Sequence, residues 1–264
     1  MAVKKRNGTV PESTAAEEHW SVALDMNGER QVDLSDGRTV LLKRNGVELL
    51  SAISLPDEED VNDPVFDVTI LDGEGPTFII PMLPDKPLVL QPDAELRILP
   101  DARIRAHIPI PLGIGVVYGE GEEARLIREF PAIHLSKTWF GEPFDGEAAY
   151  SWKTTFSDGL GPRQPDERIA YCPLVIRNES PEVLGFQRLI LRVPFLSLYA
   201  VRAHIYTDRV TVRFRGQSQV SQVSIEKGPQ KGLDSAVRIF GPRSKSDRAL
   251  LRRSFSFIKN LYTG

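Results

Sequence analysis

The stretch Arg209-Val-Thr-Val-Arg-Phe-Arg215 alternates polar and apolar side chains at every second position. Successive side chains of a strand point to opposite faces, so this alternation is typical of a β-strand with one buried and one solvated face. Similar runs recur along most of the chain, separated by short clusters of Gly, Pro, Asp and Asn that favour turns. The sequence therefore predicts an all-β fold, a β-sandwich or jelly-roll-like architecture of one or two units.

The same alternating pattern predicts strands along most of the chain. The first four are expected at 20–26, 31–34, 38–43 and 47–55. Their links are Asn27-Gly28, Asp36-Gly37 and Asn45-Gly46, dipeptides that tight hairpins prefer, so we predict a meander. Further strands are expected at 65–71, 88–91, 95–99, 103–108, 168–177, 187–195, 199–207, 209–215, 220–227 and 236–240.

The ends of the chain differ from this pattern. Residues 1–18 are polar and predict a flexible leader. From Ser244 the apolar spacing becomes helical, which predicts one amphipathic helix over 244–264. Between them we expect an acidic β unit at 19–134 and a basic one at 135–243.

The charge of the chain is unevenly distributed. Its net charge is −3 over 264 residues, but residues 1–132 carry 13 basic and 24 acidic side chains, a charge of −11. Residues 133–264 carry 20 and 12, a charge of +8. The two halves attract each other, or the basic half binds a polyanion, or the composition has drifted without functional meaning.

Composition also bears on location and on redox chemistry. No apolar stretch approaches the roughly 20 residues of a membrane span, and none follows the basic residues 4–6, so a soluble, cytoplasmic protein is expected. Cys172 is the only cysteine, which excludes an internal disulfide. It lies in the apolar run 169–176, so we predict a buried, inert thiol.

Three segments resemble a known family. They are the proline-bracketed strands of 76–92, the segment Ile108-Pro-Ile-Pro-Leu-Gly-Ile-Gly-Val-Val-Tyr118, and Lys137-Thr-Trp-Phe-Gly141 followed by Gly146 and Tyr150. Together they are similar to domain-of-unknown-function family number 432, over residues 20–240. The resemblance implies β-strands and brings no catalytic residues. Genes of this family sometimes lie beside those of small mechanosensitive channels, which implies a membrane-protein partner.

Aromatic residues gather between 136 and 160, among glycines and prolines. We expect an aromatic-rich loop, since aromatic rings in loops supply large, rigid contact area for a ligand. The candidate ligand contacts are Lys137, Trp139, Glu142, Asp145, Tyr150 and Trp152. The acidic residues of this loop also fit a carboxylate-dependent sugar enzyme, or serve simply as turn formers.

A second candidate surface is the polar face of 209–215. Arg209, Arg213 and Arg215 share this face, and a hairpin through Thr207-Asp208 would bring Arg202 beside them. These four arginines are candidates for binding a polyanion, or they pair with the acidic half of the chain. The pI of about 5.9 and the lack of a recognisable RNA-binding motif argue against a nucleic-acid partner.

The sequence favours a non-catalytic binding or regulatory module. The four histidines, 19, 107, 134 and 204, have no ligand spacing, so neither a metal site nor a cofactor is predicted. A metal- or carboxylate-dependent enzyme and a polyanion-binding protein remain the alternatives. Arg105-Ala-His107-Ile recurs as Arg202-Ala-His204-Ile, which reflects either duplicated β-units or chance. The partner is left open, a second copy of the chain included.

Overall fold

The computed structural model describes most of the chain between residues 22 and 244. The described residues are 22–34, 36–55, 64–93, 95–120, 124–131, 133–141, 143–144, 146–158, 166, 168–186, 188–201, 204–216, 221–228 and 236–244. The leader predicted at 1–18 and, apart from Ser244, the helix predicted at 244–264 lie outside them.

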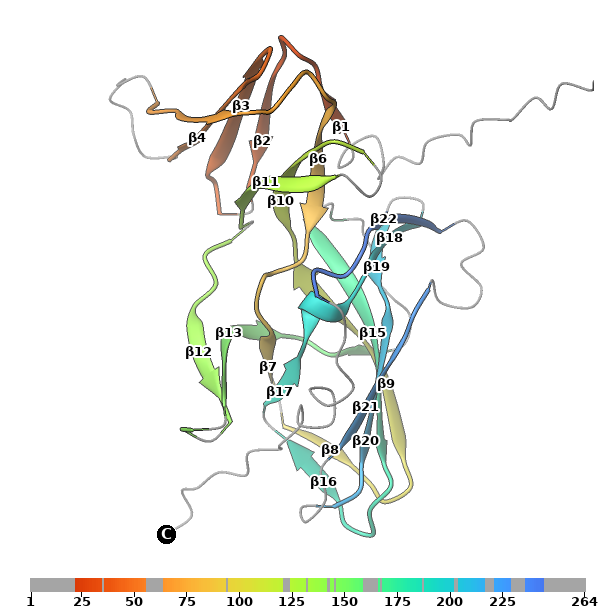
Figure 1. Ribbon diagram of the computed structural model, residues 1–264. Coiled ribbons are helices and arrows are strands. Elements are labelled where there is room, and N and C mark those ends of the chain that lie inside the picture. Colours follow the sequence, from red (N-terminus) through yellow and green to blue (C-terminus); the bar gives the residue numbers. More distant parts are fainter. Residues whose placement is uncertain are drawn as a thin grey trace, which may run out of the picture.

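Strands dominate the described residues, which confirms the all-β fold class. A single 3-10 turn at Val193–Phe195 interrupts them. None of the described segments forms a helix with the length and hydropathy that a membrane crossing requires. Figure 1 shows a small sheet of early strands at one end of the molecule and the longest strands along the other.

The early strands form the predicted meander, with one difference. The antiparallel sheet has the order β2-β3-β4-β5, with bounds Glu29–Asp33, Thr39–Asn45, Glu48–Ser54 and Asp67–Ile70. Gly37 and Gly46, in the turns on either side of β3, have φ of 84° and 59°, the left-handed region that glycine tolerates. The Asn27-Gly28 turn does not join a hairpin, because β1 (Val22–Leu24) pairs with β6 instead.

Three further, smaller sheets complete the fold. One has the order β1-β6-β10-β11, in which β6, β10 and β11 span Thr77–Met82, Gly113–Tyr118 and Arg125–Phe130. Another has the order β12-β13-β7-β17, spanning Lys137–Phe140, Glu147–Thr154, Leu88–Pro92 and Leu189–Leu191. The third pairs β8 (Leu96–Ile98) with β16 (Leu184–Phe186).

The large sheet is built around β15 (Ile169–Asn178). Its order is β14-β9-β15-β19-β18-β22, with the other strands spanning Ser157–Asp158, Arg103–Pro111, His204–Thr207, Leu198–Val201 and Val237–Phe240. Further along β15, β20 (Arg209–Phe214) takes the place of β19, and β21 (Gln222–Glu226) pairs with β20. This sheet therefore has β15 at its centre, with β9 on one side and β19 followed by β20 on the other.

One face of the large sheet is buried in the main core. Alternate residues of β9, β15 and β20, such as Ile108, Leu174 and Val212, pack with residues of β7 and β17, including Leu88 and Leu189. Strands from before and after residue 134 share sheets, since β9 pairs with β15 and β7 with β13. The division into units at 19–134 and 135–243 stays a prediction, and strand pairing crosses the proposed boundary.

The expected strand at 199–207 and the hairpin at Thr207-Asp208 are wrong. β18 and β19 are two strands that pair antiparallel, with Leu198 opposite Thr207 and Val201 opposite His204. β19 and β20 do not pair with each other; both run parallel to β15. Tyr171 lies opposite Tyr206 and Leu174 opposite Val210, so one extra residue is accommodated between the two strands, a β-bulge beside Asp208.

Candidate functional site

The outer face of the large sheet carries a row of arginines. Arg177 on β15 lies directly opposite Arg103 on β9 and Arg213 on β20. Residues directly opposite in adjacent strands share a face, with Cβ atoms about 5 Å apart. Arg105 and Arg209 extend the row along β9 and β20 by alternation, and Arg215 directly follows the end of β20. We call these six arginines, 103, 105, 177, 209, 213 and 215, the basic face.

Two carboxylates neutralise part of the basic face. Glu179 contacts Arg213 at 3.7 Å and Arg215 at 3.2 Å, and Glu226 contacts Arg209 at 3.1 Å. Within the described residues, no carboxylate pairs with Arg103, Arg105 or Arg177. The Nε atom of Arg177 is buried and has no hydrogen-bond partner among them. Positive charge on this face is therefore in excess.

The candidate arginines of the sequence have different outcomes. Arg209, Arg213 and Arg215 do share one face, and their side chains are between 29% and 45% exposed. Their carboxylate partners, Glu179 and Glu226, belong to the basic half and not to residues 1–132. Arg202 lies outside the described residues.

Sequence reasoning missed three members of the basic face: Arg103, Arg105 and Arg177. Alternation in β9 and β15 could have predicted them, because the apolar residues of these strands face inward and the arginines face outward. Alternation predicts which side chains of a strand point outward, but it does not predict which strands are neighbours.

Beside the basic face, four rings form a cluster that we call the aromatic cluster: His107, Tyr171, His204 and Tyr206. Tyr171 and Tyr206 lie in register on β15 and β19, with ring centroids 6.3 Å apart. Tyr206 also meets His107 and His204 edge-on, at 6.2 and 6.3 Å. The two copies of the Arg-Ala-His-Ile pattern thus bring their histidines to one cluster. The described residues contain no group of three His, Cys, Asp or Glu side chains placed to hold a metal ion.

The aromatic-rich segment between 136 and 160 is mainly a hairpin, not a loop. β12 and β13 pair antiparallel, with Lys137 opposite Tyr150 and Trp139 opposite Ala148. The prediction of a loop was wrong because β13 also pairs with β7, an interaction distant in sequence. Trp152 is a structural residue, since its Nε1 donates to the carbonyl of Pro109 at 2.9 Å. Glu142 and Asp145 lie outside the described residues.

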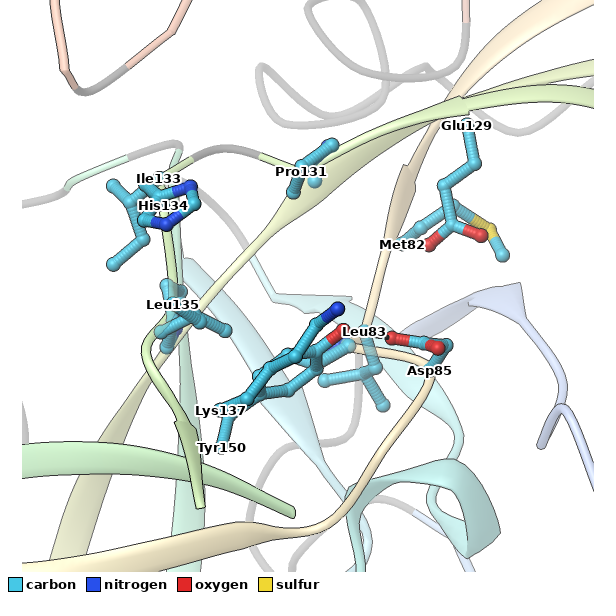
Figure 2. Close-up of a pocket in the computed structure, with 13 residues that line it drawn as sticks. Met82, Leu83, Asp85, Glu129, Pro131, Ile133, His134, Leu135, Lys137 and Tyr150 are labelled. Atoms are coloured by element: carbon cyan, nitrogen blue, oxygen red, sulfur yellow. Dashed lines mark hydrogen bonds between the residues drawn. The ribbon is translucent and has the colours of Figure 1, made fainter. Parts of the chain in front are cut away.

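Lys137 and Tyr150 line a pocket of about 160 Å³. Figure 2 shows both side chains together in this pocket, with Asp85 on one side and His134 on the other. Apolar residues supply much of the remaining wall, including Met82, Leu83, Pro131, Ile133 and Leu135. Of the sequence candidates, the structure brings Lys137 and Tyr150 to this pocket, while Trp139 is 49% exposed on the same hairpin.

The comparisons with known proteins assign a family. A family model described as "Protein of unknown function (DUF432)" matches residues 23–259. The chain belongs to this family. The match confirms the resemblance seen in the proline-bracketed strands and in the Lys-aromatic-Gly motif at residue 137. No curated protein and no solved structure matches this DUF432 chain.

Polar contacts at the pocket of the DUF432 chain shift the pKa values of three groups. The hydroxyl of Tyr150 donates to Asp85 at 2.8 Å, and the ammonium of Lys86 donates to both. Burial opposes ionisation of Asp85, yet the hydrogen bonds from Lys86 and Tyr150 lower the pKa of its carboxyl. The hydrogen bonds to Asp85 and Tyr150 raise the pKa of Lys86, and burial followed by the bond to Asp85 raises the pKa of Tyr150. These shifts hold Lys86 and Tyr150 protonated, the reverse of what a lysine or tyrosine base requires.

This triad predicts a pH-dependent contribution to the stability of the DUF432 protein. Because the folded-state pKa of Asp85 is lowered, its contribution is present above the ordinary carboxyl pKa and is lost as the pH falls through the folded value. The pKa values of Lys86 and Tyr150 are raised in the folded state, so their contribution to stability is present at neutral pH and is lost as the pH rises above 10. Asp85 is half exposed, so solvent screening limits its contribution to about 1 kcal/mol or less.

Urea unfolding of the wild type and of Asp85→Asn at pH 7 and pH 3 measures this contribution. The variant is expected to be less stable at pH 7, and the difference is expected to shrink at pH 3. A difference that is equal at both pH values would contradict the assignment. Asp72→Asn is the control. Asp36→Asn is unsuitable, because burial opposes ionisation of Asp36 but its hydrogen bonds with Arg38 lower its pKa, as happens at Asp85.

Proposed function

We propose that this protein is a cytoplasmic, polyanion-binding module and that the basic face is its binding surface. The observation that carries the proposal is the register of Arg103, Arg177 and Arg213, three arginines opposite one another on adjacent strands. Like charges in directly opposed positions destabilise a sheet, by about 0.2–1 kcal/mol per pair. A bound anion would remove this repulsion and accept hydrogen bonds from arginines that have no carboxylate partner among the described residues.

Guanidinium groups suit this role. Each presents five N–H donors in a planar fork that matches phosphate and sulfate oxygens, often in pairs. Among the described residues, two carboxylates against six arginines leave the face with a formal excess of four positive charges. The rigid strands hold the groups in a fixed row, so an extended anion meets several of them without reordering the backbone.

Fluorescence polarisation with a labelled heparin oligosaccharide tests the proposal. Arg103, Arg105 and Arg177 have no carboxylate partner among the described residues, so the triple variant R103Q/R105Q/R177Q removes charge without orphaning an acid. We expect the affinity to fall by about tenfold or more, and the slope of log affinity against log salt to become shallower by about 2. The variant should be at least as stable as the wild type, since the repulsion is gone.

Arg125→Gln is the matched control. Arg125 is also an exposed strand arginine, but it lies on β11 in another sheet and pairs with Asp72. Its substitution should leave heparin affinity within about twofold, the change expected for one remote charge. Equal affinities for the triple variant and this control would overturn the proposal.

A further inference from the structure

We infer that the polyanion is a single-stranded nucleic acid, whose phosphates lie on the basic face and whose bases stack on the aromatic cluster. This inference rests on the proposed function and names its ligand class. The observation behind it is that both sets of side chains occupy one continuous face of β15. Arg177, Val175, Pro173 and Tyr171 follow one another at alternate positions of that strand.

The dimensions of this face fit an extended strand of several nucleotides. Arg177 lies six positions after Tyr171, which corresponds to about 20 Å along β15. Proteins that bind single strands combine a positive surface that follows the backbone with aromatic side chains on which bases stack. A duplex keeps its bases stacked inside, so the aromatic cluster offers it nothing beyond the charge interaction.

The aromatic cluster has the chemistry that base contacts require. Tyr171 and Tyr206 are half-buried, so their rings are anchored in the sheet and remain partly accessible. The structure gives neither hydroxyl a hydrogen bond to a described residue. Both hydroxyls are protonated at neutral pH, since the ordinary pKa of tyrosine is about 10, and burial, together with the Asp166 carboxylate near Tyr171, raises it further. A sulfated polysaccharide or a polyphosphate chain has no planar base to use these rings.

The test compares labelled ten-nucleotide poly(U) and poly(dT) with a duplex of the same length and with heparin. Tyr171→Ala is expected to weaken binding of the single strands by about 5- to 100-fold, the effect of losing one base stack. It should leave heparin affinity within twofold, because it removes no charge. Tyr171→Phe keeps the ring and should retain most of the single-strand affinity.

The possible failures are distinguishable. If R103Q/R105Q/R177Q weakens heparin and single strands alike but Tyr171→Ala changes neither, the basic face binds polyanions and the nucleic-acid inference is overturned. Tighter binding of the duplex than of either single strand would also overturn it. If the triple variant changes the affinity for no probe, the proposed function itself fails. Binding of poly(U) without poly(dT) would support the inference and assign the ligand as RNA, through its 2′-hydroxyl groups.

Discussion

Asp208→Ala is expected to lower the free energy of unfolding by about 3–5 kcal/mol, because it removes the carboxylate acceptor of two buried donors, the N–H of Ser197 and the hydroxyl of Tyr199. The Asp208 side chain is fully buried and accepts hydrogen bonds from the backbone N–H of Ser197 at 2.7 Å and of Gly228 at 2.9 Å. The hydroxyl of Tyr199 donates to it at 3.0 Å. One carboxylate thus connects the start of β18, the bulge between β19 and β20, and the end of β21.

Chemical unfolding followed by tryptophan fluorescence measures this effect. Asp208→Asn keeps one acceptor oxygen, so its free energy of unfolding should fall by less than that of Asp208→Ala. It therefore remains informative if the alanine variant does not fold. Asp72→Ala is the control, since Asp72 is exposed and its pair with Arg125 is worth about 1 kcal/mol or less. A loss for Asp208→Ala that equals the loss for Asp72→Ala would contradict the role assigned to this carboxylate.

Cys172 is expected to react with a thiol reagent about a thousandfold more slowly in the native protein than in the unfolded chain. Its side chain is fully buried in β15, and burial raises the pKa of the thiol from 9.0 to about 12. The reacting species is the thiolate, so a shift of this size removes about 99.9% of it at pH 8. Restricted access to the core slows the reaction further.

Following Ellman's reagent by absorbance, with and without 6 M guanidinium chloride, tests this prediction. The unfolded chain should react at the rate of free glutathione, whereas native Cys172 should react about a thousandfold more slowly. Native labelling at the glutathione rate would show that the thiol is accessible, and the burial argument would then be wrong. Cys172→Ser should abolish the signal in both conditions.

The sequence located the strands well because strand formation leaves a local pattern. Alternation in 209–215 predicted β20 within one residue, and the turn dipeptides Asp36-Gly37 and Asn45-Gly46 marked two hairpins correctly. The errors arose where pairing overrides local pattern. The segment at 199–207 reads as one run yet folds as β18 and β19, and the aromatic-rich segment became a hairpin through its contact with β7.

The candidate site shows the same division. Outward-facing arginines at 209, 213 and 215 could be read from one strand, but Arg103, Arg105 and Arg177 joined them only through the pairing of β9 and β20 with β15. The pI of about 5.9 predicts that nucleic acid is not a partner, and this stays a prediction. A whole-chain average does not show where charges gather on the surface. Local concentration of charge is a property of the folded surface.

By itself, the sequence determined the all-β class, most strand positions, the buried environment of Cys172 and membership of the DUF432 family. Each of these depends on side-chain period, turn chemistry or residue order, which are local properties of the chain. Only the tertiary structure decided which strands are neighbours and in which register. Register places opposed residues on the same face, so it alone made scattered arginines into a row and set the tyrosines and histidines beside them.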